Sequence, residues 1–209
     1  MMRVTIAVSL AFMICRGAEA QPASPRIGLF VVDLHATFPN FPSDSQTAES
    51  RGLAATDLPG LGIGINAAAH VYVFRWKAIT FGVGGEFTTA RVHSTAASAG
   101  FPSVTERFTS VAPQLSFNFG SSKGWSYLSG GIGPSTWRIV PDGSPALPVD
   151  EERLKTINYG GGARWFAKQH LAFSFDVRFY ALNPSTAPSP FPPSPRTTLL
   201  IIGAGVSVR

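Results

Sequence analysis

The sequence predicts an all-β fold, namely an eight-stranded antiparallel up-and-down transmembrane β-barrel preceded by a cleaved signal peptide. Two observations lead to this prediction. Eight segments of the chain alternate between apolar and polar residues, and the connections between these segments are alternately short and long. Successive side chains of a β-strand point to opposite faces, so each alternating segment has one apolar face and one polar face.

The clearest alternation lies in residues 156–180, where two alternating runs are joined by the short connection 166–170. A connection this short predicts a β-hairpin. The apolar parity of the second run consists of Leu171, Phe173, Phe175, Val177 and Phe179. Such a face packs on a protein core in a soluble sandwich and meets lipid in a membrane barrel, so this pattern alone fits both.

The first twenty residues have the features of a secretory signal peptide. Arg3 supplies the positive charge, residues 4–15 form an apolar run, and Ala18 and Ala20 are small enough for cleavage after Ala20. The run is shorter than the roughly 20 residues that a membrane-spanning helix needs. We therefore expect residues 1–20 to be a signal peptide and residues 21–209 to form one outer-membrane β-barrel domain. Cys15, the only cysteine, lies in the predicted signal peptide, so no disulfide is expected.

In chain order, the predicted strands cover about residues 26–37, 59–74, 77–92, 106–119, 125–140, 156–165, 171–180 and 197–209. Each is long enough for a tilted membrane crossing, which takes about 9 to 11 residues. The fifth is the least regular, because glycines and Pro134 interrupt it, and which of its parities faces inward stays open.

The connections sort into two kinds. Three are tight turns near residues 75–77, 120–124 and 167–169, and four are long segments rich in Pro, Ser, Ala, Asp or Gly at 38–58, 93–105, 141–154 and 183–196. Short periplasmic turns and longer external loops are typical of bacterial outer-membrane barrels. The charged fraction of 14% is also low for a chain that has to cover a water-facing surface.

Aromatic residues near the strand ends predict two interfacial girdles. The predicted periplasmic girdle contains Tyr72, Phe74, Trp76, Phe117, Phe119, Trp125, Trp165 and Phe166. The predicted upper girdle contains Phe87, Trp137, Phe179 and Tyr180.

With these features the chain resembles the small eight-stranded outer-membrane barrels, the OmpA-like transmembrane domain and its porin-type relatives. Gly-rich phrases at 81–87, 129–133 and 159–165 add to this resemblance. It implies export to the periplasm and residence in the outer membrane of a Gram-negative cell envelope. It also implies a monomer with three kinds of partner: outer-membrane lipid, lipopolysaccharide and the barrel-assembly machinery.

The interior of an eight-stranded barrel is just filled by side chains, so no wide pore is expected. Glu86, Arg164, Asp176 and Arg178 fall on the predicted inward parity, as do Asp33, His35 and His70. Charges of both signs in a narrow lumen have to pair, because burial of an unpaired charge is costly. We predict a structural polar network in which Glu86 and Asp176 face Arg164 and Arg178.

This pattern favours a structural or surface-interaction role. Three alternatives are an adhesin-like barrel that binds through its external loops, a narrow channel for ions or small solutes, and a soluble lipocalin-like barrel. A lipid A-modifying enzyme is less favoured, because the adjacent His93 and Ser94 point to opposite faces of a strand. The four scattered histidines predict no metal site, no motif predicts a cofactor, and the scattered arginines predict no nucleic-acid binding.

Overall fold

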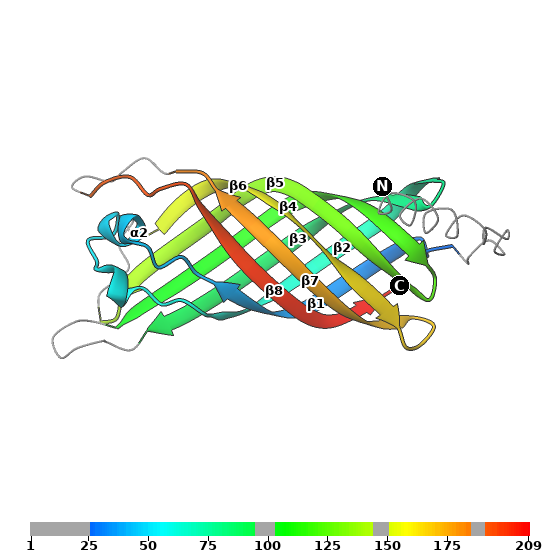
Figure 1. Ribbon diagram of the computed structural model, residues 1–209, viewed down its shortest axis with the longest axis horizontal. Coiled ribbons are helices and arrows are strands. Elements are labelled where there is room, and N and C mark those ends of the chain that lie inside the picture. Colours follow the sequence, from blue (N-terminus) through cyan, green and yellow to red (C-terminus); the bar gives the residue numbers. More distant parts are fainter. Residues whose placement is uncertain (1–25, 95–102, 144–150, 185–190) are drawn as a thin grey trace, which may run out of the picture.

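The computed structural model describes residues 26–94, 103–143, 151–184 and 191–209 and shows a closed antiparallel barrel (Figure 1). Its strands are β1 (Phe30–Asn40), β2 (Ile63–Trp76), β3 (Ile79–Ser94), β4 (Val104–Ser121), β5 (Gly124–Pro141), β6 (Glu151–Phe166), β7 (Leu171–Leu182) and β8 (Thr197–Val208). Each strand pairs with its neighbours in the sequence, and β1 closes the barrel against β8. The predicted fold class is confirmed, whereas the predicted signal peptide lies outside the described residues.

The two ends of the barrel differ in their connections. In Figure 1 the C-terminus and the tight turns lie at the right, while α2 (Ser45–Glu49) and the strand ends that the long connections join lie at the left. We call the left end the external end, as the loop lengths indicate. No helix in the described part of the chain is long and apolar enough to cross a membrane.

The first long connection contains regular structure that the sequence did not predict. It forms α2 and the 3-10 helix η1 (Ala55–Asp57). Asp44 caps α2, because its carboxylate accepts a hydrogen bond of 2.9 Å from the Thr47 amide. A second difference lies in β6, which begins at residue 151 and extends the predicted strand by five residues toward the external end.

Through most of its length, the barrel is apolar outside and polar inside. Leu115, Leu128 and Phe173 are among the exposed outward residues, with exposed fractions of 61%, 59% and 67%. The inward residues at this level include Asn66, Gln114, Asn158 and Ser174, and all are buried. β5 keeps one parity throughout, with Tyr127 and Ser129 inward and Leu128 outward. The glycines of β5 therefore do not break its alternation.

Gly131 and Gly133 in β5 fit where the neighbouring backbone comes very close. A Cβ atom on Gly131 would lie 1.9 Å from the Pro113 carbonyl oxygen, and one on Gly133 would lie 1.9 Å from the Val111 carbonyl oxygen. No side chain fits at such distances, so this part of the β4–β5 seam requires glycine.

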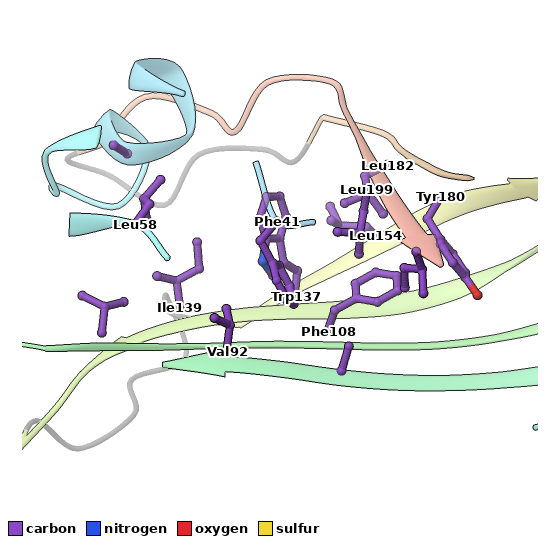
Figure 2. Packing of buried hydrophobic residues seen from close by; sticks show 14 residues of the cluster. Phe41, Leu58, Val92, Phe108, Trp137, Ile139, Leu154, Tyr180, Leu182 and Leu199 are labelled. Atoms are coloured by element: carbon purple, nitrogen blue, oxygen red, sulfur yellow. The ribbon is translucent and has the colours of Figure 1, made fainter. Parts of the chain in front are cut away.

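At the external end the polarity of the wall is inverted on β3 to β6. On β4 the inward residues there include Val104 and Phe108, while Arg107 points outward. The buried apolar cluster at this end consists of Phe41, Ala48, Leu58, Ala90, Val92, Val104, Phe108, Trp137, Ile139, Leu154, Tyr180, Leu182, Leu199 and Ile201 (Figure 2). An apolar interior with a polar exterior is the pattern of a water-soluble barrel. The external end of the barrel thus extends beyond the lipid-facing band.

Five aromatic residues of the predicted girdles lie on the inward parity instead, namely Tyr72, Trp125, Trp137, Phe166 and Tyr180. Trp125, Trp137 and Tyr180 are buried, with exposed fractions of 3%, 2% and 0%. Trp125 stacks on Phe166 at the turn end, with ring centroids 4.9 Å apart. Both tryptophans lie on the inward parity of β5, the strand whose parity the sequence left open. Trp137 and Tyr180 belong to the apolar cluster, which the inverted polarity places inside the external end.

Candidate functional site

The candidate functional site is the barrel interior together with the first external connection, which covers its external end. The first layer of the interior is an ion pair between Arg164 of β6 and Asp33 of β1. Arg164 donates hydrogen bonds from Nε and Nη2 to the two carboxylate oxygens, at 2.8 and 2.6 Å. Ser207 also donates to Asp33, and the Tyr127 ring lies 3.8 Å from the Arg164 guanidinium carbon. Two parallel bonds between planar groups make this a strong pair.

The second layer is centred on Arg178 of β7, which contacts two carboxylates. Its Nε lies 2.9 Å from Glu86 Oε2, and its Nη2 lies 3.0 Å from Asp176 Oδ2. Tyr180 donates a hydrogen bond to Glu86, and Tyr127 donates one of 2.6 Å to Asp176. All of these groups are buried. Each buried charge in this layer is therefore compensated, as the low dielectric of the interior requires.

The four residues singled out from the sequence all lie in the lumen, but they divide into two groups. Glu86 and Asp176 both contact Arg178, whereas Arg164 pairs with Asp33. The alternation of the strands indicates which residues point inward, but it contains no information on depth. Depth depends on the register around the closed barrel, which brings β1 and β6 residues together across the lumen.

A buried histidine–serine pair was not predicted. His35 Nε2 lies 2.8 Å from the Ser174 hydroxyl, and both residues are buried. This is the spacing of a base beside a nucleophile, but His35 Nδ1 has no hydrogen-bond partner among the described residues. An orienting acceptor on that nitrogen is what catalytic pairs use. The pair therefore lacks the third member of a triad and sits in a closed interior.

The apolar cluster at the external end is completed by the first connection. Phe41 and Leu58 come from this connection and pack with Trp137, Ile139 and other inward side chains of the strands (Figure 2). Residues 41–62, which we call the cap, thus insert apolar side chains into the mouth of the barrel. The described lumen is closed by this cluster at its external end and by the two ion-pair layers below it.

Polar contacts hold the cap in place. Arg51 Nη2 lies 2.9 Å from Glu152 Oε1 of β6, and the two side chains are only 4% and 6% exposed. Ser194, from the last long connection, donates a hydrogen bond of 3.0 Å to Glu152. The Ser94 hydroxyl donates one of 3.1 Å to the Asp57 carbonyl oxygen. The cap is therefore anchored directly to β6 through Arg51 and to β3 through Asp57, while Ser194 hydrogen-bonds to the carboxylate that Arg51 contacts.

One further carboxyl group lies inside the apolar cluster. Glu106 of β4 is fully buried and accepts a hydrogen bond of 2.8 Å from the Trp137 indole nitrogen. Its other carboxyl oxygen has no hydrogen-bond partner among the described residues. The Glu106–Trp137 bond links β4 to β5 beneath the cap.

The electrostatics of the cap itself are set at the start of α2. Partial burial raises the pKa of Asp44, but hydrogen bonds from the Thr47 amide and hydroxyl outweigh it, so the pKa lies below the ordinary value of 3.8. The ionised carboxylate is thus the form that the cap stabilises.

Comparisons with known proteins agree with the class that this geometry defines, the small eight-stranded outer-membrane β-barrels. The chain is similar to the crystal structure of Neisserial surface protein A (NspA), with a TM-score of 0.55 and 14% identity over 87% of this chain and 97% of that one. It is also similar to Ail, the attachment invasion locus protein of Yersinia pestis, with a TM-score of 0.49 and 14% identity over 87% and 99%.

Ail in complex with the heparin analogue sucrose octasulfate gives the same TM-score, with 15% identity over 85% of this chain and 97% of that one. At these identities the likeness is one of fold. No protein-family model matches the chain, and no curated protein matches its sequence. The resemblance to small eight-stranded outer-membrane barrels is confirmed at the level of the fold.

Proposed function

We propose that this protein is an integral outer-membrane barrel whose role is structural or lies in contacts made by its external surface. The observation that supports this most is the cap. The same segment that closes the lumen, with Phe41 and Leu58 packed inside, presents its other face outward, where Gln46, Glu49 and Thr56 are exposed. A closed interior beneath an ordered surface favours contact over transport.

The outer wall supports a membrane location. Large apolar side chains such as Leu115, Leu128 and Phe173 are exposed around the barrel, and a water-soluble protein rarely exposes so large an apolar surface. With residues 1–20 as an export signal, the protein would reach the outer membrane through the periplasm.

The cap also supports the adhesin-like alternative. A binding surface held rigid before contact loses less conformational entropy on binding. Beside the cap, Phe191, Pro192 and Pro193 are exposed, and Phe191 lies against Gly52. These residues form a small apolar patch on the external end, next to the anchored segment.

Site-directed labelling tests the location and orientation. The predicted mature chain has no cysteine, so Glu49→Cys in the cap and Lys123→Cys in a tight turn each introduce a single thiol. We expect a membrane-impermeant maleimide to label Glu49→Cys in intact cells, and Lys123→Cys only after the outer membrane is permeabilised. The opposite pattern would reverse the orientation. Labelled protein in the soluble fraction would contradict the membrane location.

Three further measurements separate the alternatives. A planar bilayer containing the purified protein should show no conductance above that of lipid alone, and steady single-channel steps would favour the narrow channel.

Cells expressing the protein should adhere to an epithelial monolayer more than cells expressing Phe191→Ser with Pro192→Ser and Pro193→Ser. Equal adherence would remove these residues from the contact surface and favour a structural role. Lipid A extracted from expressing cells should be chemically unchanged.

A further inference from the structure

The neighbours of Glu106 within the sheet are all apolar. Glu106 lies on the inward parity of β4, and its exposed fraction is 0%. The residue directly opposite on β3 is Val92, and the one directly opposite on β5 is Ile139 (Figure 2). The next inward residues of β4 on either side are Val104 and Phe108, and all four neighbours are buried. The carboxyl group of Glu106 is therefore surrounded by hydrocarbon on the inner face of the sheet.

Only one of the two carboxyl oxygens of Glu106 has a hydrogen-bond partner in the described chain. Trp137 Nε1 donates a hydrogen bond of 2.8 Å to Oε1, and no described residue bonds Oε2. An ionised carboxylate needs donors at both oxygens, and its burial without them is costly. A protonated carboxyl group has no charge and leaves one O–H group to be satisfied. The geometry therefore favours the neutral form of Glu106.

The charged and titratable groups that face Glu106 come from three elements of the described chain. The cap contributes Arg51, whose Nη2 lies 2.9 Å from the Glu152 carboxylate of β6. β7 contributes Tyr180, whose hydroxyl group donates its hydrogen bond to the second ion-pair layer below the cluster. The residues that β3, β5 and β8 contribute to the cluster are apolar. One guanidinium group thus serves two carboxyl groups, and it lies against Glu152.

The cap separates this carboxyl group from water at the external end. Phe41 and Leu58 of the cap belong to the apolar cluster, as does Ala48 of α2. Glu106 lies on the part of β4 beyond the lipid-facing band, where its neighbour Arg107 points outward and is exposed. Water, and not lipid, therefore enters the mouth of the barrel when the cap leaves it. Docking of the cap and hydration of Glu106 exclude each other.

We propose that a proton on Glu106 holds the cap closed, and that the cap opens as this proton is lost. While the cap is docked, the carboxyl group is neutral inside the cluster. When the cap opens, the group meets water and ionises as an ordinary glutamate does. Acid therefore orders the external surface, and a rise in pH loosens it. This inference concerns the order of the cap and goes beyond the role proposed above.

The range of pH follows from the two environments of Glu106. Burial raises the pKa of Glu106 to about 8, although the hydrogen bond from Trp137 and the charge of Arg51 act to lower it. In the open cap the pKa returns to the ordinary value of 4.5. Between these values the docked cap binds more protons than the open cap, so its stability falls as the pH rises. The titration of Asp44 lies below pH 3.8, outside this range.

The test measures opening of the cap in the predicted mature chain, residues 21–209, refolded into lipid nanodiscs. Ala48→Cys places a thiol at a buried position of α2, and Glu49→Cys places one at the adjacent exposed position. The labelling rate of Glu49→Cys divided by that of Ala48→Cys gives a protection factor, in which the pH dependence of the thiol reaction cancels. Labelling of Ala48→Cys in proportion to reagent concentration verifies that this factor reports the opening equilibrium.

The protection factor is compared in three backgrounds. The first is the chain without further change, and the second carries Glu106→Gln, which resembles the protonated side chain and does not titrate. The third carries Asp142→Asn, which removes an exposed carboxyl group at the same end of the barrel. Heat-modifiable gel mobility verifies that each variant is folded.

We expect the protection factor of the unchanged chain to fall by about tenfold for each pH unit between about pH 5 and 7.5, and to level off above about pH 8. Asp142→Asn should show the same fall. Glu106→Gln should show none and should keep the highest protection at every pH.

A level protection factor in the unchanged chain would overturn the proposal, and this result does not require Glu106→Gln to fold. A fall that persists in Glu106→Gln, or that Asp142→Asn abolishes, would assign the proton to another group and overturn it as well. Because cap opening is measured on purified protein, its failure differs from a failure of the labelling and adherence experiments in cells.

Discussion

Arg164 and Asp33 lie 131 residues apart in the sequence, yet two parallel hydrogen bonds of 2.8 and 2.6 Å join them across the lumen. Both side chains are almost completely buried. The pair links β6 to β1, strands that are not neighbours in the sheet. It therefore braces the barrel across its lumen, in addition to the backbone hydrogen bonds around it.

Replacement of Arg164 by alanine should strongly destabilise the barrel. Asp33 would remain buried without its cation, and breaking a buried pair in this way costs about 3 to 5 kcal/mol. The free energy of unfolding, measured by urea titration in liposomes with tryptophan fluorescence, should fall by about that amount. Lys168→Ala, in an exposed turn, is the control and should change it by less than about 0.5 kcal/mol. Similar stability of Arg164→Ala and the wild type would show that the pair has no net role.

The inverted polarity predicts a depth-dependent cost for a charge on the outer wall. Leu115 lies in the apolar band and Thr136 lies toward the external end, and both point outward. Leu115→Arg should cost about 2 to 4 kcal/mol of unfolding free energy in liposomes, whereas Thr136→Arg should cost about 0 to 1 kcal/mol. If the two costs are equal, the boundary of the lipid-facing band is wrongly placed.

Loss of the Arg51–Glu152 contact should release the cap without unfolding the barrel. Arg51→Ala leaves Glu152 largely buried near Ser194, so docking of the cap should weaken by about 3 kcal/mol. Limited proteolysis of proteoliposomes should then cleave within residues 41–62 much faster, while the barrel core stays resistant. Glu49→Ala, an exposed change in α2, should leave the cleavage rate unchanged. An unaltered rate for Arg51→Ala would mean that the apolar cluster alone holds the cap.

The cap should loosen in acid through Asp44. Its pKa is lower in the folded cap than the ordinary 3.8, so the ionised carboxylate contributes stability above pH 3.8. That contribution is lost as the pH falls below 3.8 and through the lowered value. Amide exchange at Thr47, corrected for intrinsic rate, should therefore quicken below pH 3.8 in the wild type. In Asp44→Asn this step should be absent, and a step of the same size would assign it to another group.

The alternation of residues was sufficient to predict the strands, their number and the inward faces of all but the fifth, because a period of two is a local property of the chain. The pairing of Arg164 with Asp33 was not predictable in this way, since it depends on the register around the whole cylinder. The rule that apolar residues face lipid also led to an error at the external end. Trp137 and Tyr180 were placed in a girdle because the sequence contains no direct mark of where the membrane stops.

The cap was missed for a different reason. Its residues are small and polar on average, and a helix of five residues is too short to show a helical repeat of apolar residues. Only Asp44 followed by Thr47 gave a local signal, that of a helix N-cap. The apolar residues that anchor it, Phe41 and Leu58, are separated by the whole connection and meet only when the barrel mouth exists.

Because the polarity of the wall is inverted at the external end, one continuous sheet is stable only when one part of it contacts lipid and the other part contacts water. In the apolar band, the outward side chains are stabilised by contact with lipid. At the external end, stability comes from the buried apolar cluster inside the barrel. Thinner lipids or harsher detergents would therefore loosen the lower portion first. The external end, with the cap packed into it, would stay folded outside the bilayer.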